Sequence, residues 1–169
     1  MFLTKLVQST IAAAVVLAAP LTASAQPYEN YYYGHKAWTV HVVTFADNSL
    51  ACRARVSEPG ASFAIWADGY SAVTLEFLRS NWDFYEGRED IIVQIDRRAS
   101  WDLTDADLSG NQILFQLPGG NASDRFLGEI VRGNQVKLFS NSGDFVESWS
   151  LAGSSASIDK LIECTRRLR

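Results

Sequence analysis

The sequence predicts a mainly β domain: an antiparallel β-sandwich or barrel of about eight strands, with a short mid-chain helix and a C-terminal helix. Three observations lead to this fold class. From Trp38 onward, apolar residues alternate with other residues at a period of two. Clusters of Gly, Pro, Asn and Asp separate these stretches, which is typical of antiparallel sheets rather than of βαβ units. Two later stretches change to the helical period.

The first 25 residues have the three parts of a secretory signal peptide. Lys5 supplies the positive charge, an uncharged apolar run covers 11–21, and small residues precede a predicted cleavage after Ala25. The run is about half of the roughly 20 residues that a membrane helix needs. We therefore expect 1–25 to be removed, and the mature chain to be periplasmic or secreted without a membrane span.

A tyrosine-rich leader covers 26–37 and has no recognisable period. It is either disordered or ordered only through contacts with the rest of the chain. The remaining residues, 38–169, are predicted to form a single β-rich domain closed by the C-terminal helix, because a chain of this length can bury one sizeable core. The eight expected strands cover 38–44, 50–56, 61–67, 72–78, 91–96, 112–117, 135–139 and 144–149.

Two stretches are predicted to be helices. Residues 123–131 place apolar side chains on one arc, and Ser123 can serve as the N-cap. The C-terminal stretch is predicted to begin near Ser154, which can also cap, and it ends in basic residues that favour a helix C-terminus. Its apolar stripe consists of Ile158, Leu161, Ile162 and Thr165.

The chain has two cysteines, Cys52 and Cys164. In an oxidising compartment two cysteines usually form a disulfide, whereas cytosolic cysteines stay as thiols. Cys52 shares a strand face with apolar residues, and Cys164 lies at the edge of the C-terminal stripe. We therefore expect a bond that fastens the last helix over one open end or face of the sheet.

The tail WSLAGSSASIDKLIEC, together with Trp38, the Cys52-Arg53-Ala54 step and Trp82, carries a resemblance. It resembles small exported proteins of alphaproteobacteria. More remotely, the layout is similar to the invasion-associated locus B family, whose members are exported β-sandwiches with an early tryptophan, disulfides and a closing helix. The resemblance implies an envelope protein and brings no catalytic residue with it.

The charge balance bears on the class of partner. The chain has 15 basic and 19 acidic side chains, a net charge of −4, and loss of Lys5 with the signal peptide would make it more acidic. Nucleic-acid binding needs a concentrated positive surface. We therefore expect no nucleic-acid partner, and the sequence indicates no cofactor and no metal.

Two acidic stretches are candidates for chemistry. Asp105, Asp107 and Ser109 have the spacing of oxygen ligands in a calcium loop, but the twelfth position is Gln116 rather than Glu, which favours a solvated turn. The stretch 83–90 holds four carboxylates that a hydrolase could use in pairs. A polar loop is the simpler interpretation of that stretch. Its carboxylates are Asp83, Glu86, Glu89 and Asp90.

Alternation predicts polar and aromatic side chains on the face opposite to the core. If Phe63 faces the core, Trp66 faces outward, and the same argument turns His41 and Phe139 outward. An outward tryptophan can anchor a partner, or it can be covered by the leader or a helix. We expect an exported, non-enzymatic envelope protein that binds a protein or glycan partner, with a carboxylate-dependent hydrolase as the alternative.

Overall fold

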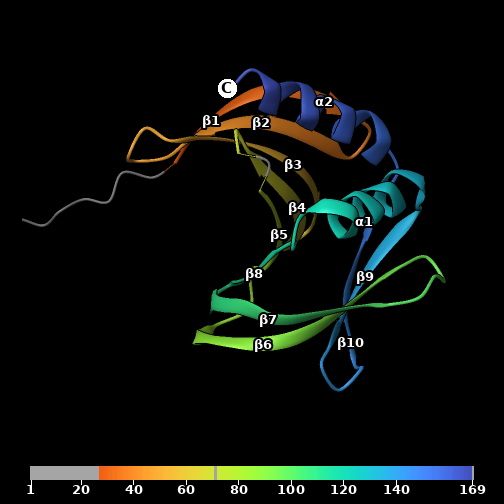
Figure 1. The fold of residues 1–169 in the computed structure, drawn as a ribbon. Helices are drawn as coiled ribbons and strands as arrows, with labels where there is room; N and C mark the ends of the chain where they lie inside the picture. The colour runs from red at the N-terminus through yellow and green to blue at the C-terminus, as the bar shows by residue number, and fades with distance from the viewer. Residues whose placement is uncertain (1–26, 71, 169) are drawn as a thin grey trace, which may run out of the picture.

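In the part of the chain that this computed structural model describes, ten strands form one antiparallel sheet and two helices pack against it (Figure 1). The structure describes residues 27–70 and 72–168, so the predicted signal peptide lies outside the described residues. The elements are β1 (Tyr28–His35), β2 (Trp38–Thr44), β3 (Leu50–Glu58), β4 (Ala61–Asp68), β5 (Val73–Arg79), β6 (Phe84–Ile95), β7 (Trp101–Gly110), β8 (Gln112–Gln116), α1 (Gly120–Arg132), β9 (Gln135–Ser140), β10 (Phe145–Ser150) and α2 (Ser154–Arg166).

The order of the strands is β1-β2-β3-β4-β5-β8-β7-β6-β9-β10. The sheet curls so far that its last strand returns to its first ones: β10 contacts β3, and the Trp38 indole N–H donates to the Ser150 carbonyl at 3.1 Å. This curvature gives the sheet a barrel-like form. The predicted mainly β, antiparallel class with one mid-chain and one C-terminal helix is confirmed, with ten strands instead of eight.

The core lies on the inner face of the curled sheet. Phe63 pairs directly with Phe77, and Val56 of β3 connects Phe63 to Trp38 in the same row on this face. Trp149 reaches these rings from β10. All four aromatic side chains are essentially buried, and the Phe63 and Phe77 rings stack with centroids 5.1 Å apart. Trp149 lies 6.0 Å from Phe63 and 5.7 Å from Phe77. Aromatic packing therefore joins the two ends of the sheet.

The tyrosine-rich leader is ordered as strand β1. It pairs with β2 from Tyr28 opposite Thr44 to His35 opposite Trp38. A bulge between Tyr31 and Tyr33 shifts the register, which places neighbouring tyrosines off a strict alternation. This bulge, together with the exposure of most of an edge strand, explains why the sequence shows no period here. The sequence left open whether the leader is disordered or is ordered through contacts with the rest of the chain. The structure supports order through contacts.

The sequence patterns also did not predict strand β7. It covers Trp101–Gly110, and bulges in its pairing with β6 break the alternation of its buried Leu103, Ala106 and Leu108. Asp105 adopts a φ of 67°, which few residues other than glycine do. Strand β6 begins at Phe84, so the stretch 83–90 is mostly strand rather than the expected loop.

Helix α2 packs along β1 to β4 (Figure 1). The Cys52–Cys164 disulfide fastens it to the inner face of the sheet, where Cys52 is buried in the core. The buried side of α2 includes Ile158 and Leu161, as predicted, whereas Ile162 is 42% exposed and was wrongly placed in the stripe. Within the described part of the chain, neither helix is long and apolar enough to cross a membrane.

Glycine, not serine, caps α2. The N-cap is Gly153 with a φ of 103°, and a Cβ atom there would lie 2.6 Å from the His35 carbonyl oxygen. Ser154 is instead the first helical residue, and its hydroxyl donates to the Ile130 carbonyl of α1 at 2.9 Å. The predicted cap at Ser154 is therefore wrong by one residue, and its side chain joins the two helices.

Helix α1 starts three residues before the predicted start. Its N-cap is Gly119, and both Gly119 and Gly120 have positive φ angles that allow this early start. Ser123, predicted as the N-cap, lies inside the first turn, where its hydroxyl accepts the Gly119 backbone N–H at 3.1 Å. On the inner face of the sheet, Phe126 packs edge-on against Trp101 with ring centroids 5.3 Å apart.

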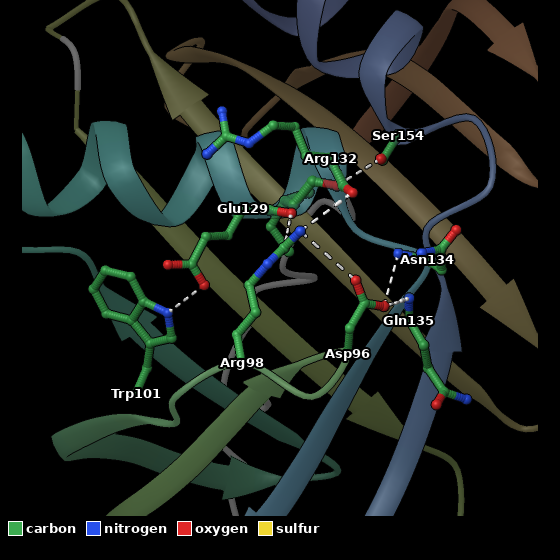
Figure 2. Close-up of polar contacts among 9 residues, drawn as sticks. Asp96, Arg98, Trp101, Glu129, Arg132, Asn134, Gln135 and Ser154 are labelled. Atoms are coloured by element: carbon green, nitrogen blue, oxygen red, sulfur yellow. Dashed lines mark hydrogen bonds and ion pairs between the residues drawn. The ribbon is translucent and has the colours of Figure 1, made fainter.

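The C-terminus of α1 is held by the turn between β6 and β7 (Figure 2). The guanidinium of Arg98 donates to the carbonyl oxygens of Glu129 and Arg132, at 3.0 and 3.4 Å. These carbonyls belong to the last turns of α1, where backbone oxygens lack partners within the helix and attract positive charge. Asp96 lies 3.8 Å from Arg98 and accepts the backbone N–H groups of Asn134 and Gln135.

We expect Arg98→Ala to lower the free energy of unfolding by about 1 to 2 kcal/mol, because two helix-terminal carbonyls lose a charged donor. Urea denaturation followed by circular dichroism measures this change. Arg97→Ala is the matched control, since Arg97 is the exposed neighbour in the same turn. Equal midpoints for the two variants would contradict a capping role for Arg98.

Candidate functional site

The outer face of the sheet, opposite to the core, carries a row of polar and aromatic side chains. Strand pairing places Tyr31 opposite His41, His41 opposite Arg53, and Arg53 opposite Trp66. Residues that are directly opposite in an antiparallel sheet project from the same face. The row continues to Thr74 on β5. The structure thus places two of the sequence-predicted surface residues, His41 and Trp66, on either side of an arginine.

Arg53 is the buried charge at the centre of this row. It is only 7% exposed, and its Nη2 donates to both carboxylate oxygens of Glu29 at 2.6 Å. Its guanidinium carbon lies 4.8 Å from the Trp66 ring centroid, a cation–π contact. Burial lowers the pKa of Arg53, and the neighbouring Arg55 lowers it further, while Glu29 and Glu76 oppose this shift. The strand β1 thus provides the counter-ion that this buried arginine needs.

Trp66 is held by a second buried carboxylate. Its indole N–H donates to Oε2 of Glu76 at 3.0 Å, and Glu76 is only 7% exposed. The Phe45 ring lies 6.0 Å from the Trp66 ring at an interplanar angle of 31°. Trp66 is therefore fixed by contacts on several sides and remains partly exposed to solvent.

These side chains line a partly open pocket of about 630 Å³ on the outer face of β1 to β5 and β8, which we call the outer pocket. This size is within the range of small-ligand and side-chain pockets. The charged and aromatic residues that line it are Glu29, Phe45, Arg53, Trp66, Asp68 and Glu76.

His41 lies beside the outer pocket rather than in its lining. Burial lowers its pKa; Arg53 and Arg55 act in the same direction, and Glu29 acts against them. Tyr31 covers the imidazole edge-on, with ring centroids 5.8 Å apart. This lowered pKa favours the neutral form of the imidazole. Within the described residues its Nδ1 is buried without a hydrogen-bond partner.

Phe139 does not join this site. It lies on β9, and four strands separate β9 from β4 in the sheet order. Its ring packs edge-on against Phe145 of β10, with centroids 5.9 Å apart. Alternation gives the side of a strand on which a residue lies, but it does not give the position of the strand in the sheet.

The two acidic stretches lie elsewhere on the sheet. The solvated turn that the sequence favoured at Asp105 and Asp107 is wrong, because both residues belong to β7. Both carboxylates bind the Arg88 guanidinium, at 2.9 and 2.8 Å, so this strand pair carries an exposed ion-pair network. The four carboxylates within 83–90 do not appear among the residues that line the outer pocket.

Arg53, Glu76 and Glu29 are among the residues of the site for which the sequence interpretation predicted no binding role. Arg53 alternates with apolar residues on a predicted strand. An arginine in this position indicates a charge on the outer face that needs a partner. Glu76 is an acidic residue within an otherwise apolar strand, which is a similar signal. Glu29 lies in the aperiodic leader, where the sequence alone gives no signal for its contact with Arg53.

Comparison with known proteins gives no relative: no family model, curated protein or solved structure matches this chain. The function is therefore inferred from the residues and geometry of the outer pocket. The pocket combines two aromatic rings, one arginine held by Glu29 and a buried carboxylate, a combination suited to binding.

Proposed function

We propose that this protein is an exported, non-enzymatic envelope protein that binds a protein or glycan partner in the outer pocket. The observation that carries the proposal is the outer pocket itself, in which Trp66 and Phe45 stand beside the buried charged side chains Arg53 and Glu76. Tryptophan and arginine in water-shielded positions are the side chains that most often dominate binding energy. Preorganised side chains also lose little entropy when a partner binds.

Export is the second part of the proposal. It is supported by the signal-peptide pattern that precedes the predicted cleavage after Ala25, and the Cys52–Cys164 bond is compatible with an oxidising compartment. The resemblance of the C-terminal tail to exported proteins of alphaproteobacteria points the same way. A periplasmic or secreted location would bring the outer pocket into contact with envelope proteins and glycans.

Site-specific photo-crosslinking tests the binding function. A benzophenone amino acid at Tyr70 places the crosslinker on the turn between Asp68 and Ala72, two residues that line the outer pocket. The same amino acid at Tyr85 on β6 is the matched control, because Tyr70 and Tyr85 are 94% and 96% exposed. In the exporting host we expect adducts from position 70 that Trp66→Ala abolishes, and none from position 85.

Digestion of the adducts with a protease or with glycan hydrolases then shows which class of partner is bound. Adducts that form equally from both positions, or that do not depend on Trp66, would contradict binding in the outer pocket.

A further inference from the structure

Glu76 is a buried carboxylate with too few partners. Within the described residues, one neutral donor reaches it, the indole N–H of Trp66, and it forms no ion pair. Arg53 is close enough for its charge to interact with Glu76, but its hydrogen bonds go to Glu29. A carboxylate has about four acceptor positions, and its burial is costly unless donors or a cation compensate it. Glu76 therefore has capacity for a further donor, and it lines the outer pocket.

The charges of the outer pocket point to a cation. Its lining includes three carboxylates, Glu29, Asp68 and Glu76, and one guanidinium, that of Arg53. The Glu29 carboxylate neutralises the Arg53 guanidinium, with 2.6 Å between Oε1 of Glu29 and Nη2 of Arg53. Asp68 and Glu76 then form no ion pair with another residue of the lining, so the pocket keeps a net negative charge that complements a positively charged group.

The apolar part of the lining fits the stem of a basic side chain. Phe45 and Trp66 provide ring surface, and two alanines, Ala51 and Ala72, provide small apolar walls. Lysine and arginine bury their methylene stems along such surfaces and direct the charged end to a polar partner. A cation near the face of tryptophan gains cation–π energy as well. An amino sugar carries the same charge but lacks an apolar stem.

We infer that the outer pocket takes one lysine or arginine side chain of a partner protein, with Glu76 as its counter-ion. The inference rests on the proposed binding function and narrows it to a protein partner with a basic anchor. The charged end bonds Glu76, the stem lies along Phe45 and Trp66, and Arg53 with Glu29 supports Trp66 from the sheet.

The test is an NMR titration with two short peptides that differ in one group. The probes are the capped peptide Gly-Gly-Lys-Gly-Gly and its norleucine analogue, which keeps the stem and lacks the ammonium group. The signal is the indole N–H of Trp66, identified by its loss in Trp66→Phe. We expect saturable shifts with the lysine peptide and binding at least tenfold weaker with the norleucine peptide.

Glu76→Gln is the variant that isolates the charge, because the amide keeps an acceptor for the Trp66 indole. We expect it to weaken the binding of the lysine peptide at least tenfold, and circular dichroism checks that its fold is unchanged. Glu58→Gln is the matched control, since it removes a carboxylate at the exposed end of β3, outside the pocket lining. This control should bind the lysine peptide as the unaltered protein does.

Three results would overturn the inference. Equal binding of the two peptides would show that the outer pocket is merely apolar. Saturable shifts with glucosamine but with neither peptide would assign it to a glycan; in both cases the proposed binding function stands. No binding of any probe, together with no Trp66-dependent crosslinks from position 70, would refute the inference and the proposed function together.

Discussion

Deleting α2 by ending the chain after Gly153 should leave the protein unfolded or aggregated. The deletion removes the buried side chains of Ile158 and Leu161 and uncovers the inner face of β1 to β4. Each of these side chains contributes about 1.5 to 3 kcal/mol by burial. The lost Cys52–Cys164 bond contributes about 4 to 5 kcal/mol for a separation of 112 residues. Their sum is comparable to the whole stability of a typical domain, about 5 to 15 kcal/mol.

Near-UV circular dichroism and size-exclusion chromatography measure the outcome. Cys164→Ser should be milder than the deletion, because it keeps the packed helix and loses only the crosslink. Ile162→Ala on the same helix should change the melting temperature little, since that side chain is 42% exposed. A truncated chain that stays monomeric with an unchanged near-UV spectrum would show that α2 is not needed for the core.

Glu29→Ala should lower the free energy of unfolding by about 2 to 3 kcal/mol, because it leaves the buried guanidinium of Arg53 without its charged acceptor. This loss of stability is smaller than the loss expected when a fully buried ion pair is broken, because the Glu29 side chain is 34% exposed. Urea denaturation measures the loss. Glu58→Ala, at an exposed position of β3, is the control and should cost little.

The double variant Glu29→Ala/Arg53→Met measures how strongly Glu29 and Arg53 depend on each other for their contribution to stability. Removing both charges avoids an uncompensated buried cation, so the double variant should be more stable than the Glu29→Ala variant alone. If the losses of the two single variants simply add, the ion pair does not couple β1 to β3. In that case the order of the leader depends on its pairing with β2 alone.

Much of the fold could be predicted because its signals are local. Alternation marks seven of the ten strands over most of their length, and the helical period marks α1 and α2 within a few residues. The Cys52–Cys164 bond was predicted from the presence of two cysteines in a chain expected to be exported to an oxidising compartment, and the structure confirms the bond. The strands β1 and β7 were missed because bulges break their period and, in β1, because exposure at the sheet edge removes the pattern.

The candidate site could be predicted only in part. Outward positions for Trp66 and His41 follow from strand periodicity, whereas Phe139 shares the same signal and lies on β9, outside the lining of the pocket. The pocket also needs Glu29 and Glu76, whose roles arise from contacts to Arg53 and Trp66. A local pattern cannot predict such contacts because it carries no information on which strands become neighbours.

The sequence by itself determined the β-rich class, the face on which each regular strand buries its side chains, and the tether of the last helix. Only the tertiary structure decided that the leader becomes an edge strand and that its Glu29 pairs with a buried arginine 24 residues later. The physical reason is that burial of apolar side chains follows the local period, whereas the partner of a buried charge is set by the order and register of the strands.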